Sequence, residues 1–216
     1  MAIRWVFLDM GYTLVDEDAV WRARCREQAA MPEAREKGVT AEMLWREIEN
    51  ASRASLPQFR TVMEKFGFSQ AAPYRSELET LYPEAPEALK ALSRSYRLGI
   101  IANQKAGLAK RLEAFGIAGY FSLVISSWEA GAMKPDPAIF LLALEKARCA
   151  PEEAVMAGDR LDNDIFPARS LGFRAVWVRR GFGALQTPRS REHEPHAVVP
   201  SLAQLPGALR ALENDR

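Results

Sequence analysis

Near its amino terminus the chain reads Trp5-Val6-Phe7-Leu8-Asp9-Met10-Gly11-Tyr12-Thr13. The first four residues form a short apolar run, which is typical of a buried strand. A polar turn that contains glycine follows at once, so Asp9 is predicted to stand where that strand ends. Ligand sites in open parallel sheets form beyond the carboxyl ends of the strands. If the strand belongs to such a sheet, Asp9 lies at the functional edge.

The second half of the chain supplies further strands of the same kind. Apolar runs are found at residues 98–102, 122–126, 154–157 and 174–178, and residues 197–199 are predicted to form a short edge strand. Segments with helical spacing separate these runs, including a helix from about Asn163 to Leu171. Fully apolar strands that alternate with amphipathic helices are typical of a parallel sheet covered on both faces. We therefore expect an α/β protein with a Rossmann-like core.

The segment from about Val15 to Leu81 has a different pattern, with helical spacing and no convincing strand. Thr40 is placed to cap one helix, and Gly67 is placed to end another. The apolar stripes of these two helices contain Leu44, Ile48 and Ala51, and Phe59, Val62, Met63 and Phe66. The sequence therefore predicts a helical unit at residues 15–81, inserted into a core domain formed by residues 1–14 and 82–216.

The composition is that of an ordinary globular protein. The 216 residues are 48% hydrophobic and 26% charged, and 29 Lys and Arg balance 28 Asp and Glu. No overall basic excess favours nucleic acid or anionic lipid. The apolar runs are far shorter than the roughly 20 residues of a membrane span. We expect neither nucleic acid nor membrane as a partner.

The cysteines and the segment from Gly181 to Pro195 carry no chemistry by their pattern. Cys25 and Cys149 are too far apart for a metal or redox motif, and free thiols fit a reducing cytoplasm. The segment 181–195 is rich in Gly, Pro, Arg and Glu and is predicted to be a solvated loop. A cytoplasmic protein is therefore expected, since the amino terminus also has too short an apolar run for a signal peptide.

Polar and charged residues follow the predicted strands. Asp9 and Asn103 stand directly after two of them, Gly158-Asp159 follows a third, and Asp164 lies in the turn beyond Asp159. Lys134 stands at the start of the helix that follows a fourth strand. Three carboxylates and one lysine are thus predicted to meet at one edge of the sheet. Hard oxygen ligands with few neutral nitrogens suit Mg²⁺ and phosphate rather than zinc.

In this arrangement the sequence resembles the haloacid dehalogenase-like hydrolase superfamily over nearly its whole length. The family's first motif, Asp-x-Asp-x-Thr after a strand, is similar to residues 9–13 except at the third position. The lysine of its third motif resembles Lys134, and its fourth motif resembles Gly158-Asp159-Arg160-Leu161-Asp162-Asn163-Asp164. The helical segment 15–81 resembles the cap domain that this family inserts after its first motif.

The resemblance implies a magnesium-dependent phosphatase that acts on a small phosphorylated molecule. Asp9 would be the nucleophile that forms an aspartyl-phosphate, which divides one difficult displacement into two easier ones. Lys134 would balance the charge on Asp9 and on the transferred group.

The family also implies which residues bind the metal and the phosphate. Mg²⁺ would be held by Asp9, Asp159, Asp164 and the backbone carbonyl of Gly11, while Thr13 and Asn103 would bind the phosphate.

The sequence departs from the family pattern at two positions. Gly11 stands where the family has an aspartate that protonates the leaving group and later activates water. Such an acid contributes roughly 10²- to 10⁴-fold to a rate. Ala102 stands where the family has a serine or threonine. If the missing acid is the only serious defect, an aspartate at position 11 should restore acid–base catalysis.

Three functions remain open from the sequence. The first is a magnesium-dependent phosphatase whose turnover is slow because Gly11 replaces the usual acid. The second is a non-catalytic protein of the same fold that binds a phosphorylated ligand or a protein. The third is a haloacid dehalogenase, which uses an aspartate nucleophile without that acid. Monomer and homodimer are equally compatible with the sequence.

Overall fold

The computed structural model describes residues 2–214, and its largest element is a six-stranded sheet. The strands lie in the order β5-β4-β1-β6-β7-β8, and every neighbouring pair is parallel. Their bounds are β1 (Trp5–Leu8), β4 (Arg97–Ala102), β5 (Phe121–Ser126), β6 (Ala154–Gly158), β7 (Arg174–Val178) and β8 (Ala197–Val199). The predicted strands, including the edge strand at 197–199, are therefore confirmed.

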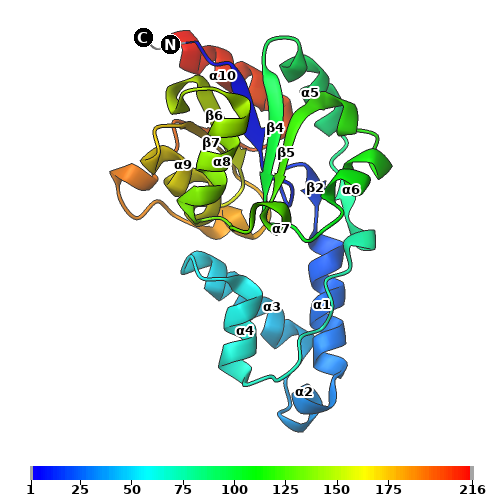
Figure 1. The fold of residues 1–216 in the computed structure, drawn as a ribbon. Coiled ribbons are helices and arrows are strands. Elements are labelled where there is room, and N and C mark those ends of the chain that lie inside the picture. The colour runs from blue at the N-terminus through cyan, green and yellow to red at the C-terminus, as the bar shows by residue number, and fades with distance from the viewer. Residues whose placement is uncertain (1, 215–216) are drawn as a thin grey trace.

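Helices cover both faces of this sheet (Figure 1). One face is covered by α5 (Ala85–Ser93), α6 (Leu108–Ala114) and α10 (Leu205–Asn214), and the other by α8 (Pro137–Ala147) and α9 (Phe166–Ser170). A short helix, α7 (Ser127–Ala130), follows β5.

Strand β1 contributes to both hydrophobic cores. Val6 and Leu8 belong to the core under α5, α6 and α10, whereas Trp5 and Phe7 belong to the core under α8 and α9. All four side chains are buried, because successive residues of a strand point to opposite faces and both faces are covered here. The expected Rossmann-like α/β fold is confirmed.

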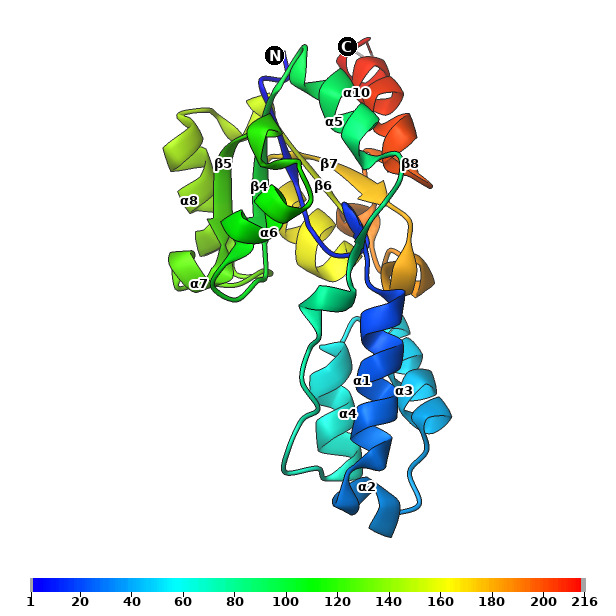
Figure 2. The ribbon, with the colours of Figure 1, turned by 90° about the vertical axis from the view of Figure 1, so that its right-hand side faces the viewer.

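A separate helical body lies below the sheet (Figure 2). This helical body consists of α1 (Asp18–Ala30), α2 (Pro32–Glu36), α3 (Ala41–Arg53) and α4 (Gln58–Phe66). Thr40 caps α3 as predicted, because its side chain accepts a hydrogen bond of 3.3 Å from the backbone N–H of Met43. Gly67 ends α4 with a left-handed φ of 60°, a conformation that favours glycine.

Two very short strands connect the helical body to the sheet. β2 (Val15–Asp16) pairs with β3 (Thr80–Leu81) in antiparallel fashion. Our expectation of no strand between Val15 and Leu81 is therefore wrong at both ends. The pairing joins residues far apart in the sequence, so no local pattern signals it. The domain boundaries at residues 14/15 and 81/82 stay a prediction.

The segment from Gly181 to Pro195 is not entirely the solvated loop that we expected. Its first residues form a short helical turn (Gly181–Leu185) that places Phe182 in the hydrophobic core of the helical body. The ring of Phe182 packs against Trp21 and Trp45, and its carbonyl accepts a hydrogen bond of 2.6 Å from the Ser52 hydroxyl. The glycine-rich composition indicated a loop, but Phe182 within it buries a large apolar area.

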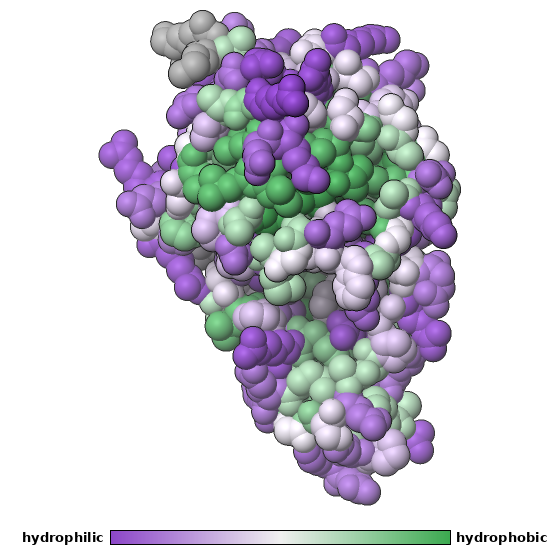
Figure 3. All heavy atoms as spheres, in the orientation of Figure 1, coloured by the Kyte–Doolittle hydropathy of each residue, from purple (hydrophilic) through white to green (hydrophobic). Residues whose placement is uncertain are grey.

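Figure 3 shows hydrophobic surface gathered over the upper body, which contains the six-stranded sheet, and hydrophilic residues along the outer edges of the helical body. Within residues 2–214, no helix combines the length and the apolar character that a membrane crossing requires. Cys25 and Cys149 are free thiols, as predicted. The cytoplasmic location stays a prediction.

Candidate active site

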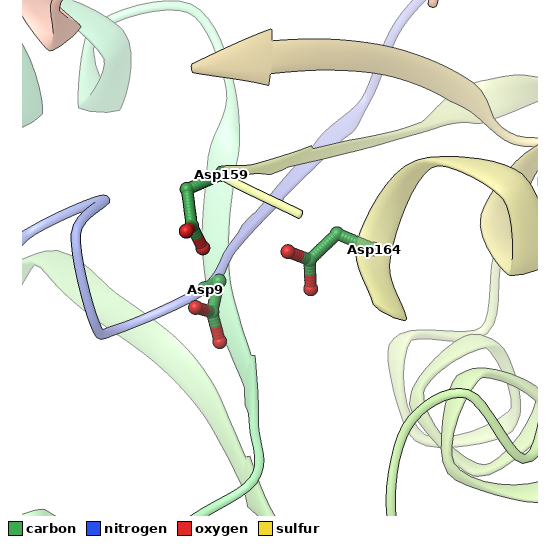
Figure 4. A group of neighbouring side chains, drawn as sticks. All are labelled: Asp9, Asp159 and Asp164. Atoms are coloured by element: carbon green, nitrogen blue, oxygen red, sulfur yellow. The ribbon is translucent and has the colours of Figure 1, made fainter. Parts of the chain in front are cut away.

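Three carboxylates converge at the carboxyl edge of the sheet. Oxygen atoms of Asp9, Asp159 and Asp164 lie within 4.8 Å of one another. Figure 4 shows their carboxyl groups turned toward a common space. Asp9 and Asp159 are neighbours because they follow β1 and β6, which pair in parallel with Leu8 opposite Ala157. The sheet itself therefore brings these two acids together.

Asp164 reaches the same space from an unusual turn. Residues Leu161–Ile165 form one turn of π-helix, so α9 begins later than the predicted helix from about Asn163 to Leu171. Such turns are rare and are often found at functional sites. The backbone N–H of Arg160 donates a hydrogen bond of 3.0 Å to Asp164 Oδ2.

Gly158 provides the room that Asp164 needs. A Cβ atom at position 158 would lie 2.4 Å from Cγ of Asp164. A side chain there would therefore push the carboxylate out of the site. The glycine at the end of β6 is required for this close approach rather than for an unusual backbone angle.

Lys134 lies between two of the acids. Its Nζ donates hydrogen bonds of 2.6 Å to Asp9 Oδ1 and 2.5 Å to Asp164 Oδ1, and only 4% of the residue is exposed. Asn103 holds the backbone at this point, because its Nδ2 donates to the Lys134 carbonyl at 2.8 Å and its Oδ1 accepts from the Lys134 N–H at 2.7 Å. Asn103 thus positions the lysine.

Burial and neighbouring charges together shift the pKa values of Asp159, Asp164 and Lys134. Burial, reinforced by the neighbouring carboxylates, raises the pKa of Asp159 well above its ordinary value. Burial also raises the pKa of Asp164 to about 6, although the Lys134 ammonium opposes this effect. For Lys134, burial alone lowers the pKa, but Asp164 and Asp9 outweigh it and the net change is a rise.

The donor set fits a divalent cation that prefers oxygen. Three carboxylates face one ammonium group, so the site carries more negative than positive charge. A hard cation such as Mg²⁺ binds few carboxylates and keeps several waters. Gly11 lines the same cavity as Asp9 and Asp159, so its carbonyl remains a predicted fourth ligand.

A cavity of about 120 Å³ opens onto the acids. Both bodies contribute to its walls, which include Trp21 and Gln58 from the helical body and Gln104, Arg160 and Phe182 from the upper body. A cavity needs only about 10–15 Å³ of such volume to hold one water molecule. The cavity thus has room for a phosphoryl group.

The remaining predicted residues lie in different places. Asn103 and Gly11 line the cavity. Thr13 is fully buried and is not among the lining residues, and its hydroxyl oxygen has no hydrogen-bond partner among the described residues. Ala102 is buried at the end of β4. Phosphate binding by Thr13 therefore stays a prediction.

The sequence analysis missed Glu17, which also lines the cavity. Glu17 is 8% exposed, and burial raises the pKa of its carboxyl group to about 7 despite hydrogen bonds from Tyr74 and Trp21. It precedes α1 directly, in the acidic run Asp16-Glu17-Asp18. Acids are common at helix starts because they favour the dipole. Because the position at a helix start already explains an acid there, the sequence does not indicate that Glu17 lies in the site.

Glu17 belongs to a buried chain of polar groups. The Tyr74 hydroxyl lies 2.6 Å from Glu17 Oε1 and 2.8 Å from Glu79 Oε1. One hydroxyl carries one hydrogen, so one of the two carboxyl groups must supply the second hydrogen. Glu79 also forms an ion pair with Arg111, whereas burial raises the pKa of the Glu17 carboxyl group to about 7. The hydrogen is therefore best placed on Glu17.

Comparison with known proteins identifies the family. A family model described as haloacid dehalogenase-like hydrolase matches residues 3–172. A phosphoserine phosphatase of Thermus thermophilus is 41% identical over 127 residues, which are 58% of this chain and 49% of that protein. A glyceraldehyde 3-phosphate phosphatase of Methanopyrus kandleri is 34% identical over 139 residues, 62% of this chain and 58% of that protein. The matched part thus spans about half of these relatives' length.

Solved structures include a close match to the fold. The crystal structure of a HAD phosphatase from Thermococcus onnurineus superimposes with a TM-score of 0.69. It is 26% identical in sequence, and the match covers 96% of this chain and 98% of that one.

Proposed function

Because the chain belongs to the haloacid dehalogenase-like hydrolase family, we propose that it is a phosphatase with Asp9 as its nucleophile. The observation that carries the proposal is the convergence of Asp9, Asp159 and Asp164 within 4.8 Å, with Lys134 bonded to two of them. A buried acidic cluster of this kind has a cost in desolvation, and a catalytic site is where such a cost is expected.

Lys134 orients the nucleophile. Its ammonium group holds Oδ1 of Asp9, so the carboxylate keeps a defined direction at the cavity wall. The Asp9 carboxylate would attack phosphorus and form an aspartyl-phosphate, which water then hydrolyses. The positive charge of Lys134 would stabilise the negative charge that collects around phosphorus in both steps.

Mg²⁺ is the cofactor of this proposal. Asp9, Asp159 and Asp164 would hold it, together with the carbonyl of Gly11. When bound, the ion would offset the repulsion between the carboxylate and the phosphoryl oxygens and thereby permit the attack.

The substrate would be a small phosphorylated molecule. The relatives named above are phosphatases of phosphoserine and of glyceraldehyde 3-phosphate, both small metabolites. The cavity of about 120 Å³ accommodates a phosphoryl group, and Trp21 and Gln58 of the helical body line it. The rest of the substrate would therefore lie against the helical body, which would act as the cap. The amide of Asn103 uses one N–H on Lys134 and keeps a second for a phosphoryl oxygen.

A non-catalytic phosphate-binding protein is the second candidate. Gly11 and Ala102 favour it, because each removes a polar side chain that the family places at the phosphoryl group. A dehalogenase fits less well, since it needs no metal and this site presents three acids suited to one.

The test is a phosphate-release assay on the purified chain. The panel would contain phosphoserine, glyceraldehyde 3-phosphate and an aryl phosphate, each with Mg²⁺ and with a chelator. We expect release that requires Mg²⁺ and that disappears in Asp9→Asn. Binding of phosphate without any release would support the non-catalytic protein, and halide release from 2-haloacids would support the dehalogenase.

A further inference from the structure

The space beside Gly11 is filled by the carboxyl group of Glu17. A Cβ atom built on Gly11 would lie 2.3 Å from Glu17 Oε1, 2.7 Å from Cδ and 3.0 Å from Oε2. Real Cβ atoms essentially never lie closer than 3.0 Å to such an atom. The carboxyl group of residue 17 therefore occupies the volume in which a side chain of residue 11 would begin.

This carboxyl group has access to the reaction space. Glu17 and Asp9 line the same cavity of about 120 Å³. The acidic residues that line this cavity are Asp9, Glu17, Asp159 and Asp164. Glu17 alone among these four has no predicted role as nucleophile or metal ligand.

Two side chains keep the carboxyl group in this position. The Tyr74 hydroxyl lies 2.6 Å from Oε1 of Glu17, and Nε1 of Trp21 donates a hydrogen bond of 3.1 Å to Oε2. Because each oxygen has its own partner, the group cannot turn away from Gly11 without loss of both contacts. A catalytic group held in place in this way needs little reorganisation during the reaction.

We propose that Glu17 is the catalytic acid and base of this site and supplies, from the residue before α1, the carboxyl group that position 11 lacks. The inference rests on the proposed phosphatase function and deepens it. Gly11 is then not a defect of the site, because the absence of a side chain at position 11 leaves room for the Glu17 carboxyl group.

The proton movements balance in two steps. In the first step an Asp9 oxygen bonds to phosphorus and the bond from phosphorus to the ester oxygen breaks. The ester oxygen takes the electron pair and receives the Glu17 carboxyl proton, so the product leaves as an alcohol. In the second step the Glu17 carboxylate takes a proton from water, whose oxygen bonds to phosphorus while the bond to Asp9 breaks. Glu17 is then protonated again.

The inference reverses our expectation for an aspartate at position 11. Gly11 does not have a left-handed φ, so the backbone would accept a side chain. The obstacle is the Glu17 carboxyl group itself. Gly11→Asp alone should therefore displace Glu17 and lower activity instead of raising it.

The experiment compares Glu17→Gln with the unchanged protein on an alkyl phosphate and on an aryl phosphate. Loss of the acid should slow the alkyl phosphate by roughly 10²-fold or more, because an alkoxide needs a proton to leave. An aryl oxide leaves without being protonated. With the aryl phosphate the variant should therefore release a burst of one equivalent of the aryl product per protein and then turn over slowly. The matched control is Glu27→Gln. Glu27 belongs to α1 but pairs with Arg75 at the surface, so this variant should behave like the unchanged protein.

A double variant tests the placement directly. Gly11→Asp/Glu17→Ala moves the carboxyl group to position 11 and removes the side chain that blocks it. We expect it to be at least 10-fold faster on the alkyl phosphate than Glu17→Ala.

The outcomes separate the inference from the proposed function. Equal slowing of both substrates without a burst, or no recovery in the double variant, would show that Glu17 has only a structural role. An active Glu17→Gln variant would overturn the inference while leaving the phosphatase intact. If the unchanged protein releases no phosphate from any substrate, the proposed function itself fails.

Discussion

The Nζ atom of Lys134 lies 2.6 Å from Oδ1 of Asp9, although 125 positions separate the two residues in the chain. The pair is formed where the loop between α7 and α8 meets the end of β1, and the lysine is almost completely buried. A buried ammonium group with carboxylate partners is costly to separate from them, because removal of one partner leaves uncompensated charge.

Lys134→Met should therefore lower both activity and stability. Loss of one partner of a buried ion pair costs about 3–5 kcal/mol, since the two carboxylates lose their counter-charge. Mg²⁺ should restore part of this stability, because a bound cation also compensates the acids. Urea unfolding with Mg²⁺ and with a chelator measures both effects. Lys90→Met, at a solvent-exposed lysine, is the control and should change stability by less than about 0.5 kcal/mol. Equal stability of the two variants without metal would contradict the expectation.

Asp159→Asn should change metal affinity and metal-free stability in opposite directions. The variant loses a predicted ligand charge, so calorimetry should show at least a 10-fold lower affinity for Mg²⁺. Without metal the same change removes a buried carboxylate whose pKa burial raises, so the melting temperature should stay the same or rise. A parallel loss of stability and affinity would instead indicate that Asp159 has a structural role.

Gly158→Ala should damage the site through Asp164. The added methyl group would lie 2.4 Å from Cγ of Asp164, so the carboxylate has to move. Forced insertion of a methyl group into a packed region costs about 1–3 kcal/mol. Mg²⁺ affinity should fall as well. The matched control is Gly119→Ala, because a Cβ at position 119 meets no atom within 4 Å. Unchanged Mg²⁺ binding in Gly158→Ala would disprove this dependence.

The stability of the metal-free protein should carry a pH dependence from Glu17. Burial raises the pKa of its carboxyl group from 4.5 to about 7, so between these values the folded protein holds a proton that the unfolded chain releases. The stabilisation is complete below about pH 4.5 and is lost as the pH rises through about 7. One pKa unit corresponds to about 1.4 kcal/mol, so the full change is roughly 3 kcal/mol.

Glu17→Gln removes this proton site and provides the reference. The difference in unfolding free energy between the unchanged protein and the variant should fall steadily from pH 4.5 to pH 7 in the presence of a chelator. A difference that is constant with pH would show that Glu17 keeps an ordinary pKa in the folded state.

The sheet and the acidic cluster could be predicted because their signals are local. The run Trp5–Leu8 is apolar at every position, as expected for a strand covered on both faces. Asp9 and Asp159 each directly follow such a run, and parallel neighbours carry their ends to the same edge. These features depend on the order of residues alone.

Three other features could not be predicted, because they depend on contacts across the fold. The pairing of β2 with β3 joins segments about 65 positions apart, with two residues in each strand. Phe182 stands in a stretch whose glycines indicate a loop, and only the helical body explains its burial. The carboxyl group of Glu17 lies where a side chain of residue 11 would begin, and no spacing in the sequence reveals this contact.

The position of Phe182 also bears on how the protein is made. Helices α1–α4 are synthesised early, yet the ring that packs against Trp21 and Trp45 arrives only with the turn after β7. Chains fold from the amino terminus as they leave the ribosome. Until the chain has been made as far as residue 182, the nascent helical body therefore lacks one aromatic ring of its core, and Trp21 and Trp45 each lack one packing partner.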